Sequence, residues 1–132
     1  GKDVEIKTPF MCDYGYNIEL GSNVFINYNC TILDCNKVKI GNNVLMAPNV
    51  QIYAATHPTD YKLRLQELEM AYPIIIEDNV WIGGGTIICP GVTIGKNSVI
   101  GAGSVVVKDI PANSLAVGNP CIVVKKLEDC DE

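Results

Sequence analysis

The sequence predicts an all-β solenoid, a parallel β-helix of hexapeptide repeats, with one loop leaving the coil at about residues 57–73. Aliphatic residues recur at every sixth position: Ile76, Ile82, Ile88, Ile94, Ile100 and Val106. Small or branched residues recur four positions after each of these: Val80, Thr86, Val92, Ser98, Ser104 and Ile110. Neither a strand period of 2 nor a helical period of 3.6 produces this spacing, and a repeat of six is typical of solenoids of very short strands.

Each hexad supplies one short strand and one corner, so three hexads make one triangular coil. The first aliphatic residue of a hexad then points into the prism and stacks on its equivalent in the next coil, roughly 4.8 Å away. Burying each such side chain contributes about 1.5–3 kcal/mol. The stack can therefore offset the entropy lost when the chain is ordered.

The corners need residues that tolerate a positive φ, and Gly and Asn do so at the lowest cost. The third position after each opening aliphatic residue is Asn79, Gly85, Gly91, Asn97 or Gly103. A simple buried strand would not repeat the aliphatic signal and the corner signal in phase.

Earlier in the chain the repeats are interrupted. Residues 1–17 are less regular and are predicted to form the opening coil. Clean repeats begin at Leu20, Ile26 and Ile32, and again at Ile40, Met46 and Ile52. Between them the phase slips by two residues around positions 34–39, which we interpret as a two-residue bulge at a corner. Asn43 and Asn49 return at the corner position.

Residues 56–72 carry charge without any hexad and include His57, the only histidine. This insertion should loop out from a corner, where it either lines a binding face or is a solvated linker. Repeats restart at Ile76 and end near Pro111. Residues 122–124 are predicted to be a final strand, followed by a solvated tail.

Composition limits the possible functions. A chain of 132 residues with a net charge of −5 fits a single domain, residues 1–132, and disfavours non-specific nucleic-acid binding. There is no run of apolar residues long enough to span a membrane. The six cysteines lack Cys-x-x-Cys spacing and histidine partners, so we expect no metal site and free thiols in the cytoplasm.

Several motifs resemble one family, that of the maltose/galactoside O-acetyltransferases. The similar segments cover nearly the whole chain and are residues 13–17 (DYGYN), 27–31 (NYNCT), 55–58 (ATHP), 79–85 (NVWIGGG), 100–104 (IGAGS) and 118–120 (GNP). The hexads alone would identify only the fold, whereas NVWIG and THP in this order are more specific. The resemblance implies a left-handed β-helix, a homotrimer with sites between subunits, and acetyl-CoA as co-substrate.

The reaction that the resemblance implies is direct transfer of an acetyl group to a sugar hydroxyl. This needs a base for the hydroxyl proton, and a neutral imidazole is suited to that role at pH 7. His57 is accordingly expected to be the general base. A structural histidine is the alternative interpretation. Activity should then fall as the pH drops and the imidazole takes up a proton.

The resemblance also implies the residues that bind the acceptor: Asp13, Asn27, Asp34 and Trp81. A carboxylate and an amide can hold sugar hydroxyls through directional hydrogen bonds. Asp13 and Asn27 could instead be ordinary corner residues, and Trp81, which should project outward, could be a subunit contact. Relatives often have an acidic residue after Asp34 where this chain has Cys35, so acceptor recognition should differ at that point.

For acetyl-CoA the resemblance implies Gly84, Gly101, Ala102, Lys108 and Lys125. The Gly84 amide would meet the thioester oxyanion, the next two residues would line the track of the cofactor, and the lysines would face its phosphates. Gly84, Gly101 and Ala102 could equally be ordinary repeat residues, and the lysines could be solvated. Some relatives place an arginine where this chain has Ile122.

Members of the family usually begin with a helical segment that this sequence does not contain, so either the sequence is a fragment or the acceptor pocket is more open. Two other functions remain possible on the same fold. One is a non-catalytic trimeric scaffold, and the other is an acetyltransferase for serine or a drug. A trimeric metalloenzyme would need several histidines for its metal.

Overall fold

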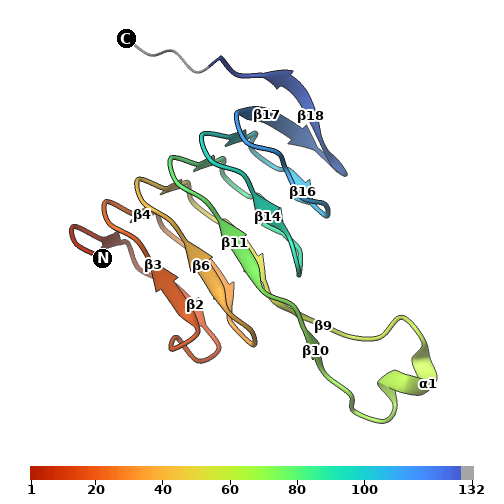
Figure 1. Cartoon of the computed structure of the whole chain (residues 1–132). Helices are drawn as coiled ribbons and strands as arrows, with labels where there is room; N and C mark the ends of the chain where they lie inside the picture. Colours follow the sequence, from red (N-terminus) through yellow and green to blue (C-terminus); the bar gives the residue numbers. More distant parts are fainter. Residues whose placement is uncertain (129–132) are drawn as a thin grey trace.

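The computed structural model describes residues 1–128 of the chain and shows a three-sided prism of stacked coils, a left-handed parallel β-helix (Figure 1). Each coil contributes a short strand to each of three sheets, so the predicted arrangement of three hexads per coil is confirmed. Neighbouring strands within a sheet belong to successive coils and pair in parallel. The loop carrying α1 (Tyr61–Arg64) projects from the side of this stack.

The first sheet runs in the order β1 (Glu5–Ile6), β4 (Phe25–Ile26), β7 (Leu45–Met46), β12 (Trp81–Ile82), β15 (Val99–Ile100), β17 (Ser114–Gly118) and β18 (Cys121–Lys126). The second sheet contains β2 (Phe10–Cys12), β5 (Cys30–Leu33), β8 (Gln51–Tyr53), β13 (Ile87–Ile88) and β16 (Val105–Val106). The third contains β3 (Ile18–Leu20), β6 (Val38–Ile40), β11 (Ile74–Ile76) and β14 (Thr93–Ile94). The final strand predicted at residues 122–124 is part of β18, which turns back antiparallel to β17.

The core is the stack of inward aliphatic residues that the repeat predicts. All six opening aliphatic residues from Ile76 to Val106 are buried, and so are all six residues at the fifth position. Every buried side-chain nitrogen or oxygen of residues 1–128 has a hydrogen-bond partner. The small polar residues of the core, such as Thr86 and Ser98, achieve this by donating to backbone carbonyls of the corners.

Three corners join the sheets, and we name them by the sheets they connect. The first corner links the first sheet to the second, the second corner links the second to the third, and the third corner links the third back to the first. Positive φ values occur at each corner residue predicted from the sequence, namely Asn43, Asn49, Asn79, Gly85, Gly91, Asn97 and Gly103. The corner prediction is therefore confirmed.

The third corner carries a ladder of asparagines that stabilises the prism along its length. Asn23, Asn43, Asn79, Asn97 and Asn113 have φ between 56° and 63°. Each side-chain amide donates to the side-chain oxygen of the next asparagine in this order, at 2.8 to 3.2 Å. The same residues thus supply the backbone conformation of the corner and a line of hydrogen bonds parallel to the prism axis.

The second corner is longer in the early coils than in the late ones. Leu20 pairs with Ile40, twenty residues further on, whereas Ile76 pairs with Ile94, eighteen residues further on. The early coils therefore have two extra residues at the second corner, within positions 13–17 and again within positions 34–37. The bulge predicted around residues 34–39 is confirmed. The next coil carries the predicted loop at the same corner, closed by β9 (Ala55–Thr56) and β10 (Met70–Ala71), which pair antiparallel.

Candidate functional site

Asp34 organises the second corner in the early coils. Its carboxylate is fully buried and accepts four backbone N–H groups from the corner below. Oδ1 accepts from Asp13 and Tyr14 at 3.1 and 2.9 Å, and Oδ2 accepts from Gly15 and Asn17 at 2.8 and 3.1 Å. Burial acts to raise the pKa of Asp34, but these N–H groups outweigh it, so the pKa lies below its usual range. Asp34 is thus an ionised structural residue that fixes the 13–17 segment.

The next residue, Cys35, holds the side chain of Asp13. The Cys35 thiol donates to Asp13 Oδ2 at 3.1 Å. This hydrogen bond, together with burial and the neighbouring carboxylates, raises the pKa of Cys35 to about 11. The thiol therefore stays protonated at neutral pH. Asp13 keeps its second carboxylate oxygen available to a ligand because the described residues 1–128 give it no other hydrogen-bond donor.

His57 lies above this pair, where the loop leaves the second corner. Its exposed ring lines a cavity of about 280 Å³. The lining residues are Tyr14, Cys35, Ala55, Thr56, His57, Glu69, Met70 and Ala71. The Asn36 side chain donates to the Ala71 carbonyl at 3.1 Å and ties the loop stem to the corner below. The loop therefore delivers the imidazole to a cavity that it lines together with Cys35, the residue that donates to Asp13.

The rest of the loop is held by its own short helix. The Asp60 carboxylate accepts from the Lys62 N–H at the N-terminus of α1, at 2.9 Å. The Arg64 side chain donates to the Pro58 and Thr59 carbonyls at 3.1 and 2.8 Å. Pro58 is buried although its neighbours are exposed. These contacts orient the segment that follows His57.

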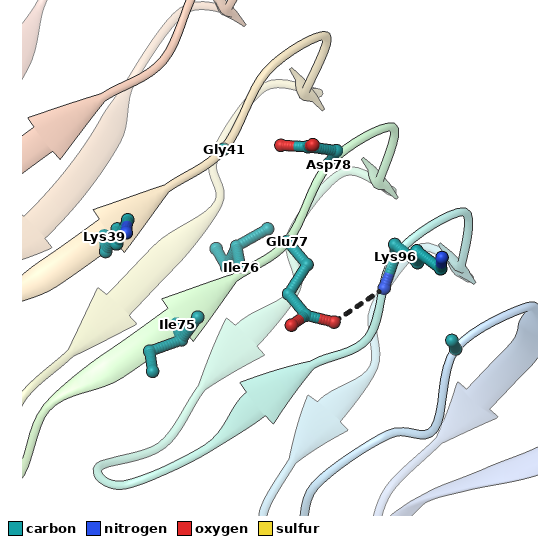
Figure 2. Close-up of a pocket in the computed structure, with 8 residues that line it drawn as sticks. Lys39, Gly41, Ile75, Ile76, Glu77, Asp78 and Lys96 are labelled. Atoms are coloured by element: carbon teal, nitrogen blue, oxygen red, sulfur yellow. Dashed lines mark hydrogen bonds between the residues drawn. The ribbon is translucent and has the colours of Figure 1, made fainter.

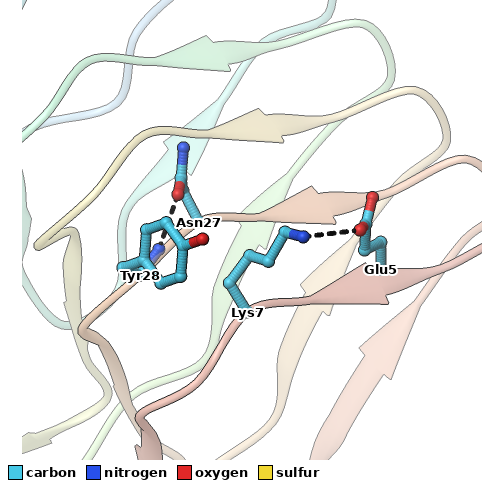
Figure 3. Close-up of polar contacts among 4 residues, drawn as sticks. All are labelled: Glu5, Lys7, Asn27 and Tyr28. Atoms are coloured by element: carbon cyan, nitrogen blue, oxygen red, sulfur yellow. Dashed lines mark hydrogen bonds and ion pairs between the residues drawn. The ribbon is translucent and has the colours of Figure 1, made fainter.

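A second group of predicted residues lies along the first corner and the first sheet. Asn27 and Trp81 share a shallow depression of about 320 Å³ with Phe25, Leu45, Met46 and Ala47. Trp81 is 53% exposed and points outward, as predicted. Figure 3 shows Asn27, whose side-chain oxygen accepts from the Tyr28 N–H at 2.8 Å, beside an ion pair between Lys7 and Glu5 at 3.0 Å.

Gly84 and Ala102 occupy equivalent positions in successive coils of the first corner. The Gly84 carbonyl accepts from the Gly103 N–H at 2.8 Å, which joins the two coils. Within residues 1–128, the backbone N–H groups of Gly84 and Ala102 have no hydrogen-bond partner. Gly101 has a packing reason to be glycine, since a Cβ there would lie 2.6 Å from Val117 Cγ2.

The structure thus divides the predicted site between two corners of the prism. Asp13, Asp34, His57 and Lys108 belong to the second corner. Asn27, Gly84, Gly101 and Ala102 belong to the first corner, and Trp81 and Lys125 belong to the adjoining first sheet. One chain places His57 in a cavity with Cys35, which holds Asp13, but neither Gly84 nor Trp81 lines that cavity.

Sequence reasoning missed Tyr14 and Glu69 as neighbours of His57, and Phe25 and Leu45 as neighbours of Trp81. The signal that could have found the first pair is the elongated second corner, which recurs in successive coils and stacks residues 14, 35 and 57. The second pair occupies positions equivalent to Trp81 in earlier coils, as the register Phe25 to Leu45 to Trp81 shows.

A larger depression, of about 590 Å³, lies on the third sheet and shares no lining residue with the His57 cavity. Its walls include Lys39, Ile75, Glu77 and Lys96 (Figure 2). Glu77 Oε1 accepts from the Lys96 backbone N–H at 3.1 Å, so its carboxylate has a structural role there. Within residues 1–128, no group of three or more His, Cys, Asp or Glu side chains is placed to hold a metal ion. No helix in that part of the chain has the length and apolar composition needed to cross a membrane.

Comparison with known proteins identifies the family. Residues 73–108 match the family model described as bacterial transferase hexapeptide (six repeats). The galactoside O-acetyltransferase of Escherichia coli is 48% identical over 132 residues, which cover 100% of this chain and 65% of that enzyme. The chain spans 60% to 65% of the length of three curated relatives that it matches.

Two solved structures agree closely with this one. A maltose O-acetyltransferase from Clostridium difficile 630 has a TM-score of 0.94 and 60% identity, over 96% of this chain and 67% of that one. A hexapeptide-repeat acetyltransferase from Vibrio cholerae, solved with acetyl coenzyme A, has a TM-score of 0.95 and 41% identity, over 97% of this chain and 70% of that one. The chain therefore belongs to the maltose/galactoside O-acetyltransferase family of hexapeptide-repeat proteins.

Proposed function

We propose that this protein is an acetyl-CoA-dependent O-acetyltransferase whose acceptor is a sugar of the maltose, glucose or galactoside type. The observation that carries the proposal is the His57 cavity, where an exposed imidazole shares the lining with Cys35, whose thiol holds the Asp13 carboxylate. The named activities of the relatives support the same chemistry. The free cysteines among residues 1–128 support a cytoplasmic location.

We further propose that the site forms between two copies of the chain in a homotrimer. The division of the predicted residues between two corners supports this, since His57 on one prism can meet Gly84 and Trp81 only on another. The outward face of the first sheet adds support because it exposes the apolar side chains of Leu45 and Trp81, 50% and 53% exposed. Apolar patches of this kind mark interaction surfaces.

The first corner fits a long cofactor that carries amide groups. The free N–H groups of Gly84 and Ala102 lie in successive coils and can donate to carbonyl oxygens along that edge. When bound, acetyl-CoA supplies a thioester carbonyl that is activated toward attack. The Gly84 N–H is the donor for the oxygen that gains negative charge. Lys108 and Lys125 are exposed and can pair with phosphates.

The chain's own residues then supply the rest of the mechanism. Asp13 and Asn27 hold acceptor hydroxyls by hydrogen bonds, and Trp81 provides an apolar wall for the sugar ring. His57 takes the proton of the attacking hydroxyl, which passes to the departing thiolate. Asp34 acts through the 13–17 segment, whose backbone it fixes, and so positions Asp13.

The test is acetyl transfer by wild type and by His57→Ala, measured as thiol release from acetyl-CoA against a panel of sugars. Loss of the general base should lower kcat by roughly 10²–10⁴-fold. Wild-type kcat/KM should fall as the pH is lowered into the range where imidazoles take up a proton. The circular dichroism spectrum should not change.

Near-wild-type transfer by His57→Ala would remove the proposed role of the histidine. If wild type releases no thiol with any sugar, calorimetry with acetyl-CoA alone separates the remaining cases. Binding without transfer would indicate a different acceptor, and no binding would indicate a scaffold without enzymatic function.

A further inference from the structure

The His57 cavity has an excess of negative charge, which affects the kind of acceptor that it can bind. Of its eight lining residues, Glu69 is the one carboxylate, and none is a lysine or arginine. Asp13 is not itself a lining residue, but its carboxylate accepts a hydrogen bond at 3.1 Å from the thiol of Cys35, which does line the cavity. The pKa of Tyr14 is raised by Cys35, Tyr16 and burial, and the Glu69 and Asp13 carboxylates contribute in the same direction.

Nearby cations do not cancel this charge. Arg64, the closest arginine along the chain, is turned toward the Pro58 and Thr59 carbonyls of its own loop. Lys37, which follows the Asp34 corner, lines a separate depression with Tyr16 and Glu19. The Asp34 carboxylate is not free to pair with a ligand, because its oxygens already accept four backbone N–H groups.

The opposite half of the site, on the first corner of a neighbouring copy, also lacks a free cation near Asn27. Lys7 is the cation beside Asn27 in Figure 3, and its ammonium group is paired with the Glu5 carboxylate at 3.0 Å. That ion pair is close to neutral as a unit. The acceptor therefore meets two uncompensated carboxylates, Asp13 and Glu69, on the His57 side.

We propose that this pocket selects an acceptor that carries a positively charged nitrogen, such as an amino sugar, over a neutral sugar, and that it rejects anionic sugars. The proposal rests on the proposed O-acetyltransferase function and specifies its substrate class. Asp13 and Glu69 would face the ammonium group while His57 takes the proton of a hydroxyl on the same molecule. Phosphorylated sugars, uronic acids and nucleotide sugars would be repelled by both carboxylates.

The experiment uses three methyl glycosides of different charge, in both the glucose and the galactose configuration. They are the neutral glycoside, its 2-trimethylammonio analogue and the uronide. The trimethylammonio group is a permanent cation that cannot itself be acetylated, so every product is an O-acetyl ester. Transfer is followed by thiol release and the product is identified by mass spectrometry.

We expect kcat/KM to be roughly fivefold higher for the cation than for the neutral glycoside, and lower again for the uronide, from charge interactions in a partly solvated site. Glu69→Gln should reduce the preference for the cation, and higher ionic strength should do the same. The matched control is Glu19→Gln, an exposed glutamate on the third sheet, which should leave the preference unchanged.

Two results would overturn the proposal while leaving the proposed function intact. One is a neutral glycoside used as well as or better than the cation. The other is a cation preference that Glu69→Gln does not alter. Failure of all six glycosides to accept acetyl groups would instead count against the sugar acetyltransferase itself, and the charge preference would fall with it.

Discussion

At the scale of single residues, the candidate site depends on how two neighbouring side chains divide their roles. Asp34 is buried and uses its carboxylate to fix the backbone of residues 13–17, whereas Cys35 is partly exposed and uses its thiol to fix the side chain of Asp13. An acceptor at the proposed site would therefore meet an Asp13 carboxylate whose backbone and side chain are both constrained. Such constraint is what an acceptor site needs, since poorly held groups lose catalytic effect.

The Cys35 thiol gives a prediction about pH. Its pKa of about 11 lies above the ordinary thiol value of 9.0, so the folded chain binds the thiol proton more tightly than the unfolded chain does. The contribution of the Cys35–Asp13 bond to stability is complete below pH 9.0 and is lost as the pH rises toward 11. Alkylation by iodoacetamide, which needs the thiolate, should therefore rise steeply only near that upper value.

Asp13→Asn removes the main cause of the shift and should move the alkylation profile of Cys35 to lower pH. The measurement is site-resolved mass spectrometry of alkylated peptides across pH. Cys89, whose pKa is raised by burial alone, serves as the internal control and should keep its profile. An unchanged Cys35 profile in the variant would show that Asp13 does not control this thiol.

At the scale of elements, the third corner shows how one residue type can meet two demands. Asparagine enters the left-handed region more easily than most residues, and its amide can both donate and accept. Asn79 does all three, with φ of 62°, a bond accepted from Asn43 and a bond donated to Asn97 at 2.9 Å. Glycine at this corner would supply the backbone conformation alone.

Two substitutions at Asn79 separate these contributions. Asn79→Gly keeps the conformation and loses both side-chain bonds, which should cost about 1–2 kcal/mol. Asn79→Ala loses the bonds and also strains the corner, for a total of about 2–4 kcal/mol. The free energy of unfolding should be measured in guanidinium at one fixed chain concentration, because assembly also contributes. Equal losses in the two variants would mean that the φ angle carries no cost here.

Most of the prism could be predicted because the information is local and repeated. The hexad that contains Ile82 is enough to predict that this side chain points inward, and the hexad that contains Asn97 is enough to predict a corner there. The neighbours of His57 could not be predicted in the same way. Tyr14, Cys35 and Glu69 meet His57 only because several coils share a lengthened corner and because β9 pairs with β10, and both depend on register between distant segments. The hydrogen bonds of the asparagine ladder could not be predicted for the same reason.

At the scale of the whole molecule, the two-corner arrangement is the basis for the proposed site between two copies. The prism is stiff because its strands pair along its full length. Bending within one chain therefore cannot bring its second corner onto its first corner. Each copy would offer its second corner to one neighbour and its first corner to the other. In a closed ring of three, this head-to-tail use of unlike surfaces yields three identical sites.

Mixing of variants tests this arrangement directly. His57→Ala disables the second corner, and Ala102→Trp blocks the first corner at an exposed position that leaves the core untouched. Either variant alone should be nearly inactive. The two variants are coexpressed with different tags in equal amounts. Every mixed trimer then contains one site built from the two intact corners. The activity of the whole coexpressed population should therefore return to roughly a quarter of the wild-type value. If the tag-purified mixed trimers are no more active than the two parents, each site lies within a single chain and the proposed sharing between copies is wrong.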